Sequence, residues 1–299
     1  MESLVESTPD TRPRTGNRED EPRRLSRRSM LAATATAAVG VGTAGIATAA
    51  MGDEPRSNGK SAIVTGSSRG IGAATARRLA HDGYAVTVNC VVNRDLAAQV
   101  VRDIEAGGGR AIWVQADVSD PVAVRGLFDE HEKTFSGVDV VVANAGIMHL
   151  APMAQMSDAD FDRMFAVNAK GSFNTLREAA RRVRDGGRIV TLSSSITQLR
   201  TATYGPYAAT KMAQDMYAAV LAKELGGRQI SVNALAPGVV NTTLFTDGKS
   251  AEQIAGFAAR TPHQRLAEPT DIADVIAALC GGDGDWVNGQ TVFANGGIV

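Results

Sequence analysis

The chain has 299 residues, and its 31 Lys and Arg residues against 32 Asp and Glu residues give a formal net charge of -1 at pH 7. This balance, with no long basic run beyond the N-terminal segment, argues against nucleic-acid binding. The two cysteines, Cys90 and Cys280, lie far apart, so they suggest neither a disulfide framework nor a metal site.

Residues 1–50 resemble a twin-arginine export signal. Residues 1–29 are polar and cannot bury enough apolar surface to order themselves. The uncharged Ala/Thr/Gly run of residues 30–50 follows Arg27-Arg28 and contains an Ala-x-Ala processing pattern. Met30 departs from the usual Phe. The alternatives are a disordered tail on a cytoplasmic protein and a transmembrane helix, which the scarcity of strongly apolar residues disfavours. We therefore expect export and no stable membrane anchor.

About 240 residues remain from Lys60, which suits one α/β domain. We expect strands over residues 61–65, 85–90, 111–116, 138–143, 188–192 and 229–234, and a last strand within 286–297. The helices are expected up to about residue 82, over 94–106, from about 121, from 158 to about 184, and over 204–225. This alternation predicts a doubly wound, mainly seven-stranded parallel sheet with helices on both faces.

The first strand leads into a glycine-rich turn, residues 66–72, and then into a helix. Glycines let a backbone approach a phosphate, and the free N–H groups of a helix end attract the anion. The spacing is G-x-x-x-G-x-G, which alone is weak evidence but gains weight from the flanking strand and helix. The turn therefore predicts a nucleotide phosphate site.

A serine and a Tyr-x-x-x-Lys pair follow later in the chain. Tyr207 and Lys211 lie on one face of the expected helix. A neighbouring cation favours the phenolate and lowers the pKa of the tyrosine toward a value useful for proton transfer. Ser194 ends a predicted strand, where ligands bind in open α/β sheets. Taken alone, the pair is more typical of a solvated helix face.

In combination, these features make residues 60–299 similar to the short-chain dehydrogenase/reductase family, closest to its 3-oxoacyl-carrier-protein reductase branch. Ala143 stands where the family often has a second Asn. The matching motifs are Thr65-Gly66-x-x-x-Gly70-Ile71-Gly72, Asp117-Val118, Asn144-Ala145-Gly146, Asn168, Ser194, Tyr207-x-x-x-Lys211 and Pro237-Gly238-Val239-Val240-Asn241-Thr242.

The resemblance implies a Rossmann-type fold and interconversion of a small-molecule carbonyl and a secondary alcohol by hydride transfer. It assigns the proton transfer to Tyr207, and a hydrogen bond to the reacting oxygen to Ser194. Lys211 would hold the cofactor ribose and favour the tyrosinate. Asn168 would kink its helix and hold a water that leads to the lysine.

The resemblance also implies a set of cofactor contacts. Asp117 would lie against the adenine, Asn144 and Gly146 would support the adenosine side, and Thr242 would bond the nicotinamide carboxamide. Each could instead be an ordinary cap, turn or loop residue. The remaining implied contacts are Gly66, Ser68, Arg69, Gly70, Ile71, Gly72, Val118, Ala145, Tyr207, Lys211, Pro237, Gly238 and Val240.

The choice of cofactor follows from charge. An NAD site usually has a carboxylate after the second strand, whereas an NADP site needs a cation. The second strand runs into Cys90-Val91-Val92-Asn93, without an acid, and Arg69 lies in the glycine turn. We therefore expect NADP, with Arg69, and Arg94 as a second candidate, forming charge-assisted bonds to the 2'-phosphate. The alternative is that both arginines face solvent.

Residues 241–262 resemble the mobile lid that closes over the substrate in this family. Residues 286–297 resemble its last strand, which often builds a subunit interface, so we expect a homotetramer. His81 and His131 are expected in surface helices, without a role. Two alternatives stay open: a nonenzymatic NADP-sensing protein on the same fold, and an exported oxidoreductase with tightly held cofactor. The side chains suggesting an apolar pocket are Met148, Leu150, Met153, Leu244, Phe245, Ile254 and Phe257.

Overall fold

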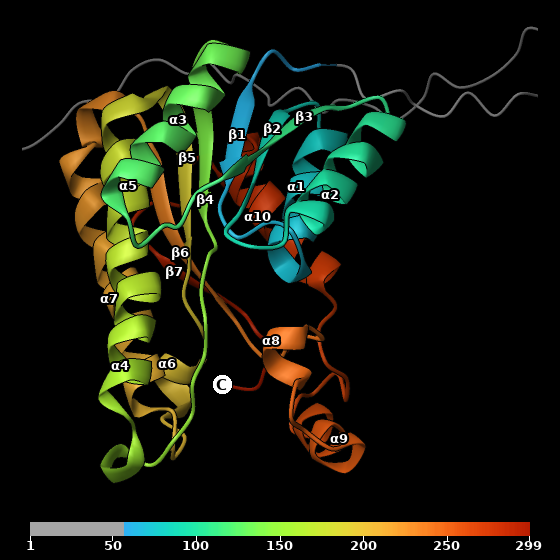
Figure 1. The fold of residues 1–299 in the computed structure, drawn as a ribbon, viewed down its shortest axis with the longest axis vertical. Helices are drawn as coiled ribbons and strands as arrows, with labels where there is room; N and C mark the ends of the chain where they lie inside the picture. Colours follow the sequence, from blue (N-terminus) through green and yellow to red (C-terminus); the bar gives the residue numbers. More distant parts are fainter. Residues whose placement is uncertain (1–56) are drawn as a thin grey trace, which may run out of the picture. The chain divides into compact units, whose positions relative to one another are not determined.

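A seven-stranded parallel sheet forms the centre of residues 57–299, the part of the chain that the computed structural model describes (Figure 1). The expected export signal, residues 1–29 and 30–50, lies outside the described residues. The strand order is β3-β2-β1-β4-β5-β6-β7, which confirms the doubly wound fold. The strands are β1 (Ser61–Val64), β2 (Ala85–Cys90), β3 (Arg110–Gln115), β4 (Val138–Ala143), β5 (Val183–Leu192), β6 (Ser231–Pro237) and β7 (Thr291–Ala294).

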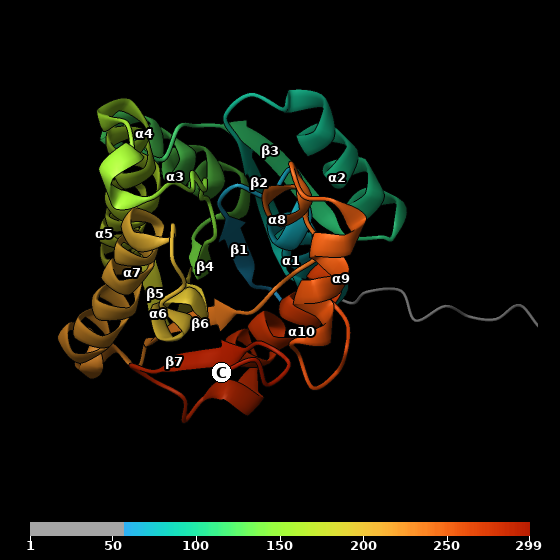
Figure 2. The same cartoon turned by 90° about the horizontal axis from the view of Figure 1, so that it is seen from below.

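Helices cover both faces of the sheet (Figure 2). One face carries α1 (Gly70–His81), α2 (Arg94–Ala106) and α10 (Pro269–Cys280), and the other carries α3 (Pro121–Phe135), α5 (Gly171–Arg182) and α7 (Gly205–Glu224). Side chains alternate between the faces of a strand. Ala62 and Val64 therefore pack with α1 and α10, while Ile63 packs with the opposite layer.

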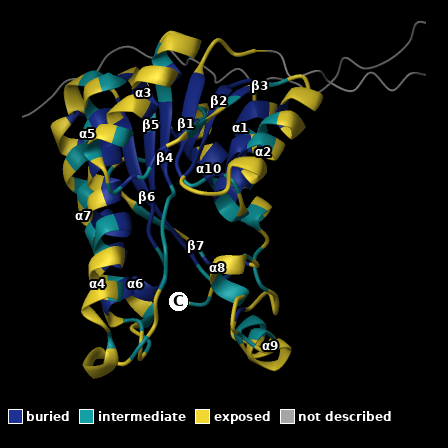
Figure 3. Cartoon of the chain, viewed as in Figure 1, coloured by how far each residue is buried: buried dark blue, intermediate teal, exposed yellow. Residues whose placement is uncertain are grey.

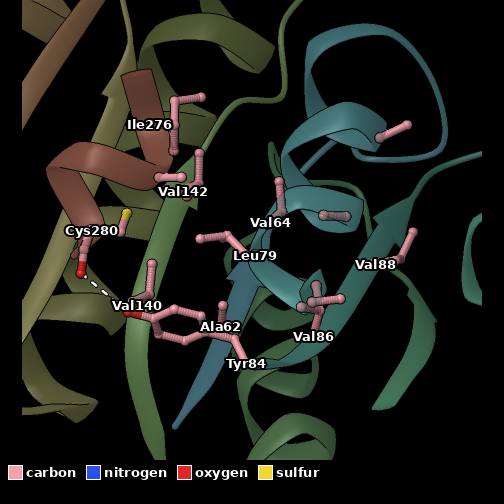
Figure 4. Packing of buried hydrophobic residues seen from close by; sticks show 14 of the residues in the cluster. Ala62, Val64, Leu79, Tyr84, Val86, Val88, Val140, Val142, Ile276 and Cys280 are labelled. Atoms are coloured by element: carbon pink, nitrogen blue, oxygen red, sulfur yellow. Dashed lines mark hydrogen bonds between the residues drawn. The ribbon is translucent and has the colours of Figure 1, made fainter. Parts of the chain in front are cut away.

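Figure 3 shows that the inner strands β1, β2, β4 and β6 are almost fully buried, as expected for a parallel sheet covered on both sides, whereas the edge strands β3 and β7 are partly exposed. Figure 4 shows one of the two main apolar clusters, in which Leu79 of α1 and Ile276 of α10 face β-branched side chains of the sheet. The Tyr84 hydroxyl ties this cluster together by donating to the Cys280 carbonyl at 3.2 Å. Both cysteines are thus core residues.

The long helix expected from residue 158 to about 184 is divided into three parts. A π-helical turn, η2 (Phe165–Lys170), lies between α4 (Asp158–Met164) and α5, and β5 begins earlier than expected, at Val183. The early start has a pairing cause, because Val183 pairs with Val138 across a register shift. The other short elements are η1 (Met153–Gln155), α6 (Ile196–Leu199), η3 (Gly226–Arg228), α8 (Thr243–Thr246), α9 (Ala251–Ala259) and η4 (Gly282–Gly284).

His131 is a core residue, which corrects the expectation that it lies on the surface. Its side chain is fully buried in α3. Nδ1 lies 2.7 Å from the Thr87 hydroxyl, and Nε2 lies 3.0 Å from both the Ser61 hydroxyl and the Gly137 carbonyl oxygen. Burial lowers the pKa of His131 from 6.5 to about 4, so the ring is neutral near pH 7. It joins α3 to β1 and β2.

Candidate active site

Two adjoining cavities lie beyond the carboxyl ends of the strands. They share five lining residues, Ile71, Asn144, Gly146, Thr242 and Leu244. The strand order reverses between β1 and β4, the place where open α/β sheets bind nucleotides. The first cavity, here called the nucleotide cavity, is also lined by Gly66, Ser68, Arg69, Gly70, Gly72, Asp117, Val118 and Ala145.

The glycine turn has a conformation that requires its glycines. Gly66 and Gly70 have φ values of +62° and +56°, where side chains are strained. A Cβ on Gly72 would lie 2.5 Å from Asn144 Nδ2. The Gly66 N–H donates to the buried Asn89 Oδ1 at 3.0 Å, which fixes the turn from β2.

The turn places the start of α1 at the wall of the nucleotide cavity. Within the described residues, the Arg69 side chain makes no capping bond to α1, so the first N–H groups of the helix remain available to an anion. Gly70, Ile71 and Gly72 line the cavity. This backbone cradle fits the pyrophosphate of a dinucleotide.

The charge at the 2'-phosphate position also fits. Arg69 is exposed and lines the cavity, as do the uncharged Cys90, Val91 and Asn93 at the end of β2. Arg94 begins α2 and is not among the residues that line this cavity in the described part of the chain. Arg163 also lines this cavity but is paired with Asp117, so Arg69 is the candidate cation for a 2'-phosphate.

Asp117 is held by two neighbours. Ser119 donates to Oδ1 from its backbone N–H at 2.9 Å and from its hydroxyl at 2.7 Å, and Arg163 donates to Oδ2 at 3.2 Å. Burial alone would raise the pKa of Asp117, but these hydrogen bonds hold it below its usual range. The carboxylate is thus ionised and positioned at the cavity wall, with Arg163 beside it.

The second cavity, here called the substrate cavity, brings Ser194, Tyr207 and Lys211 together, as the sequence predicts. Ser194 follows β5, and the other two project from α7. Tyr207 and Lys211 are 8% and 4% exposed. The Lys211 Nζ lies 5.7 Å from the Tyr207 ring centroid, and it donates to the Leu192 carbonyl at 2.6 Å and to Gln214 Oε1 at 3.3 Å.

The pKa of Tyr207 differs from the sequence prediction, which expects the neighbouring lysine to lower it. Burial raises the pKa of Tyr207 above its usual value, although its hydrogen bond with Ser194 acts in the opposite direction. Burial also lowers the pKa of Lys211 to about 8, against the attraction of Asp215. The Lys211 ammonium donates to the Leu192 carbonyl and to the Gln214 amide oxygen.

Asn168 lies in the π-helical turn and is fully buried. Its Oδ1 accepts from the Ile147 N–H at 2.8 Å, while Nδ2 donates to the Ile147 carbonyl at 2.8 Å and to the Thr210 hydroxyl at 3.1 Å. The side chain therefore joins the loop after β4 to α7. Its backbone carbonyl accepts from Gln214 Nε2 at 2.9 Å.

The walls of the substrate cavity are largely apolar. Phe245 and Phe257 meet edge to face with ring centroids 5.1 Å apart. They belong to α8 and α9 (Figure 1). Of the expected pocket residues, Leu150, Met153 and Ile254 lie outside the lining. The lining includes Met148, Leu199, Tyr204, Pro237, Gly238, Val240, Leu244, Phe245, Phe257, Arg260 and Ile298.

Sequence reasoning missed Asn89, Arg163, Tyr204 and Gln214. A polar residue within a buried strand could have drawn attention to Asn89, and the same signal applies to Gln214 within a buried helix face. Arg163 gave no local signal, because its partner Asp117 is distant in sequence.

Comparison with known proteins shows the class of this chain. A family model described as enoyl-(acyl carrier protein) reductase matches residues 66–299. A short-chain type dehydrogenase/reductase from Picea abies is 41% identical over 251 residues, covering 81% of this chain and 93% of that protein. An Arabidopsis thaliana protein named NADPH-dependent aldehyde reductase 2, chloroplastic, is 42% identical over 256 residues, covering 81% and 94%.

Solved structures agree with these relatives. A short-chain dehydrogenase from Burkholderia cenocepacia, solved in complex with NADP, matches with a TM-score of 0.77 and 38% identity, covering 82% of this chain and 99% of that one. The fold and the site define a nucleotide-binding oxidoreductase. The chain belongs to the short-chain dehydrogenase/reductase family.

Proposed function

We propose that this protein is an NADP(H)-dependent oxidoreductase that interconverts a carbonyl compound and a secondary alcohol. The observation that carries this function is the convergence of Ser194, Tyr207 and Lys211 in a cavity that adjoins a nucleotide cavity with an exposed arginine. The relatives named as an NADPH-dependent aldehyde reductase and solved with NADP support the same cofactor.

Each side chain has a defined part in the reduction. NADPH, when bound, supplies the hydride that adds to the carbonyl carbon. Tyr207 gives its hydroxyl proton to the carbonyl oxygen, and Ser194 donates a hydrogen bond to the same oxygen as negative charge develops. Lys211 supports the tyrosinate that remains. In the oxidation direction, Tyr207 takes the proton back from the alcohol.

Different residues of the nucleotide cavity bind different parts of the cofactor. The glycine turn and the start of α1 hold the pyrophosphate, Arg69 binds the 2'-phosphate, and Asp117 lies at the adenine end. Thr242 lines both cavities, which suits a contact with the carboxamide at their junction. The complete Ser194, Tyr207 and Lys211 set favours an enzyme over a nonenzymatic NADP sensor, which has no need of all three.

The substrate cavity favours a bulky apolar carbonyl compound, because Met148, Tyr204, Phe245 and Phe257 line it. The resemblance to 3-oxoacyl-carrier-protein reductases points to reduction of a C=O group, whereas the matching family model is described by enoyl reduction. The Ser194 and Tyr207 hydroxyls favour the carbonyl, since both are placed to bond an oxygen rather than an alkene carbon.

We propose a homotetramer as the working assembly. The outer face of α7 exposes Met212, Met216 and Val220, one helical turn apart, and Phe173 of α5 is exposed beside it. Such a stripe is typical of a subunit contact. Light scattering of the full chain should give four copies, and Met216→Asp should reduce that mass. An unchanged monomer for both proteins would contradict this assembly.

We also propose that residues 1–50 direct export through a twin-arginine route, so that the folded enzyme leaves with its cofactor bound. Within residues 57–299 no helix has the length and apolarity needed to cross a membrane. Cell fractionation with N-terminal sequencing decides this point. A mature start near Ala50 outside the cytoplasm supports export, and an intact Met1 form in the cytoplasm refutes it.

Turnover assays on the full chain test the proposed function. NADPH and NADH oxidation should be followed with aromatic ketones, aldehydes, a 3-oxoacyl thioester and an enoyl thioester, with product analysis for each. We expect alcohol products and a preference for NADPH. A saturated thioester as the only product would assign enoyl reduction instead, and no turnover despite NADPH binding would favour the sensor.

A further inference from the structure

Gln214 is a buried polar side chain in the apolar packing of α7. Its side chain has no exposed surface, and a buried amide is stabilising only when its hydrogen bonds are satisfied. Both polar atoms of the Gln214 amide have a hydrogen-bond partner. Nε2 donates to the Asn168 carbonyl at 2.9 Å, and Oε1 accepts from the Lys211 ammonium at 3.3 Å.

The two partners fix the orientation of this amide. A carbonyl oxygen can only accept, and an ammonium can only donate. The opposite orientation of Gln214 would place Nε2 against Lys211 and Oε1 against the Asn168 carbonyl, which are both unfavourable. The bridge between η2 and α7 therefore has one arrangement.

We propose that Gln214 is a positioning residue that fixes the Lys211 ammonium to the Asn168 carbonyl. This inference rests on the proposed function for its effect on turnover, but its structural basis does not depend on the reaction. The Gln214 side chain bridges Asn168 and Lys211, the same two residues that the family resemblance joins through a water.

An amide bridge has a different chemistry from a water bridge. A water can accept one proton while it gives up another, whereas an amide would have to become an imidic acid to do so. Gln214 therefore orients Lys211 without carrying protons to the Asn168 carbonyl.

Gln214 also acts on the charge state of Lys211. The groups that face the ammonium are the Leu192 carbonyl from β5, Gln214 itself, and the titratable Tyr207 and Asp215 from α7. Burial disfavours the ammonium, so each carbonyl that accepts from it restores part of its stability. Removing the Gln214 carbonyl should favour neutral lysine, and a carboxylate in its place should favour the ammonium.

Two substitutions test this role in opposite directions. Gln214→Leu removes the acceptor at similar volume, and Gln214→Glu replaces it with an anion. Gln99→Leu is the matched control, because Gln99 is an exposed residue of α2. The lysine signals of the cofactor-free full chain, labelled at Cε with ¹³C, should be titrated by NMR, with Lys211→Met identifying the Lys211 signal.

We expect the Lys211 midpoint to fall by roughly one pH unit in Gln214→Leu and to rise in Gln214→Glu, since a hydrogen bond to a charged group is of that size. The alkaline limb of kcat for carbonyl reduction should move with it. Because the pKa of Lys211 is about 8, kcat of Gln214→Leu should fall about twofold near pH 7 and about tenfold well above pH 8. Gln99→Leu should match the wild type. If Gln214→Leu does not fold, Gln214→Met poses the same question.

Unmoved Lys211 midpoints in folded variants would overturn the inference. Equal losses of kcat at every pH would also overturn it, because they indicate a purely structural role. A protein that turns over no carbonyl compound yet shows the opposed NMR shifts would refute the proposed function alone.

Discussion

Arg69 should determine the preference for NADPH over NADH. Its guanidinium is exposed at the nucleotide cavity, and within residues 57–299 it has no side-chain hydrogen bond to give up on binding. A charge-assisted bond contributes about 1.5–3 kcal/mol, and an exposed position favours the lower end. Arg69→Ala should therefore weaken NADPH binding roughly tenfold to thirtyfold, since 1.4 kcal/mol is a factor of ten.

Fluorescence titration of the full chain with both cofactors at one ionic strength measures this effect. NADH binding should be unchanged by Arg69→Ala, because NADH has no 2'-phosphate. Arg94→Ala is the matched control and should leave both affinities unchanged. Equal losses for NADPH and NADH would refute the reasoning, since they would show that Arg69 supports the turn. A loss of NADPH affinity in Arg94→Ala would show that the 2'-phosphate binds at the start of α2 instead.

Two further substitutions test the turn and the buried histidine. Gly72→Ala should cost about 1–3 kcal/mol of unfolding free energy and weaken NADPH binding, because its Cβ would lie 2.5 Å from Asn144 Nδ2. Gly126→Ala is the control, because Gly126 has open space around it, and it should cause neither loss. Equal melting temperatures for the two variants would contradict the prediction. Because the pKa of His131 is lowered from 6.5 to about 4, the unfolded chain binds a proton that the folded chain excludes between those values. Stability is therefore full above about pH 6.5 and falls by up to about 3 kcal/mol toward pH 4. Urea unfolding of His131→Gln should show a weaker pH dependence, and identical slopes would disprove the assignment.

The sheet could be predicted because its strands are short, β-branched and bounded by clear turns. The runs at residues 85–90 and 138–143 have the predicted bounds in the structure. The early start of β5 could not be predicted, since it depends on pairing with Val138. The π-helical turn had no local signal either. Periodicity placed His131 on a helix, but only the packing of α3 against β1 and β2 shows which face is buried.

The catalytic set could be predicted because the topology of a parallel sheet brings its carboxyl ends together. That topology alone is enough to join Ser194 to the helix carrying Tyr207 and Lys211. The direction of the lysine ammonium could not be predicted, because it depends on the Leu192 carbonyl and on Gln214. The packing of α7 against the end of β5 decides such details.

Tyr207→Phe tests directly whether Tyr207 is the proton donor. The substitution removes one hydroxyl from a buried ring, and Tyr217→Phe on the same helix removes one hydroxyl away from the substrate cavity as a control. NADPH affinity and NADPH-dependent carbonyl reduction should be measured for both in the full chain. We predict that Tyr207→Phe binds NADPH normally and loses at least about a hundredfold in turnover, while Tyr217→Phe retains both. Near-normal turnover by Tyr207→Phe would show that Tyr207 is not the proton donor.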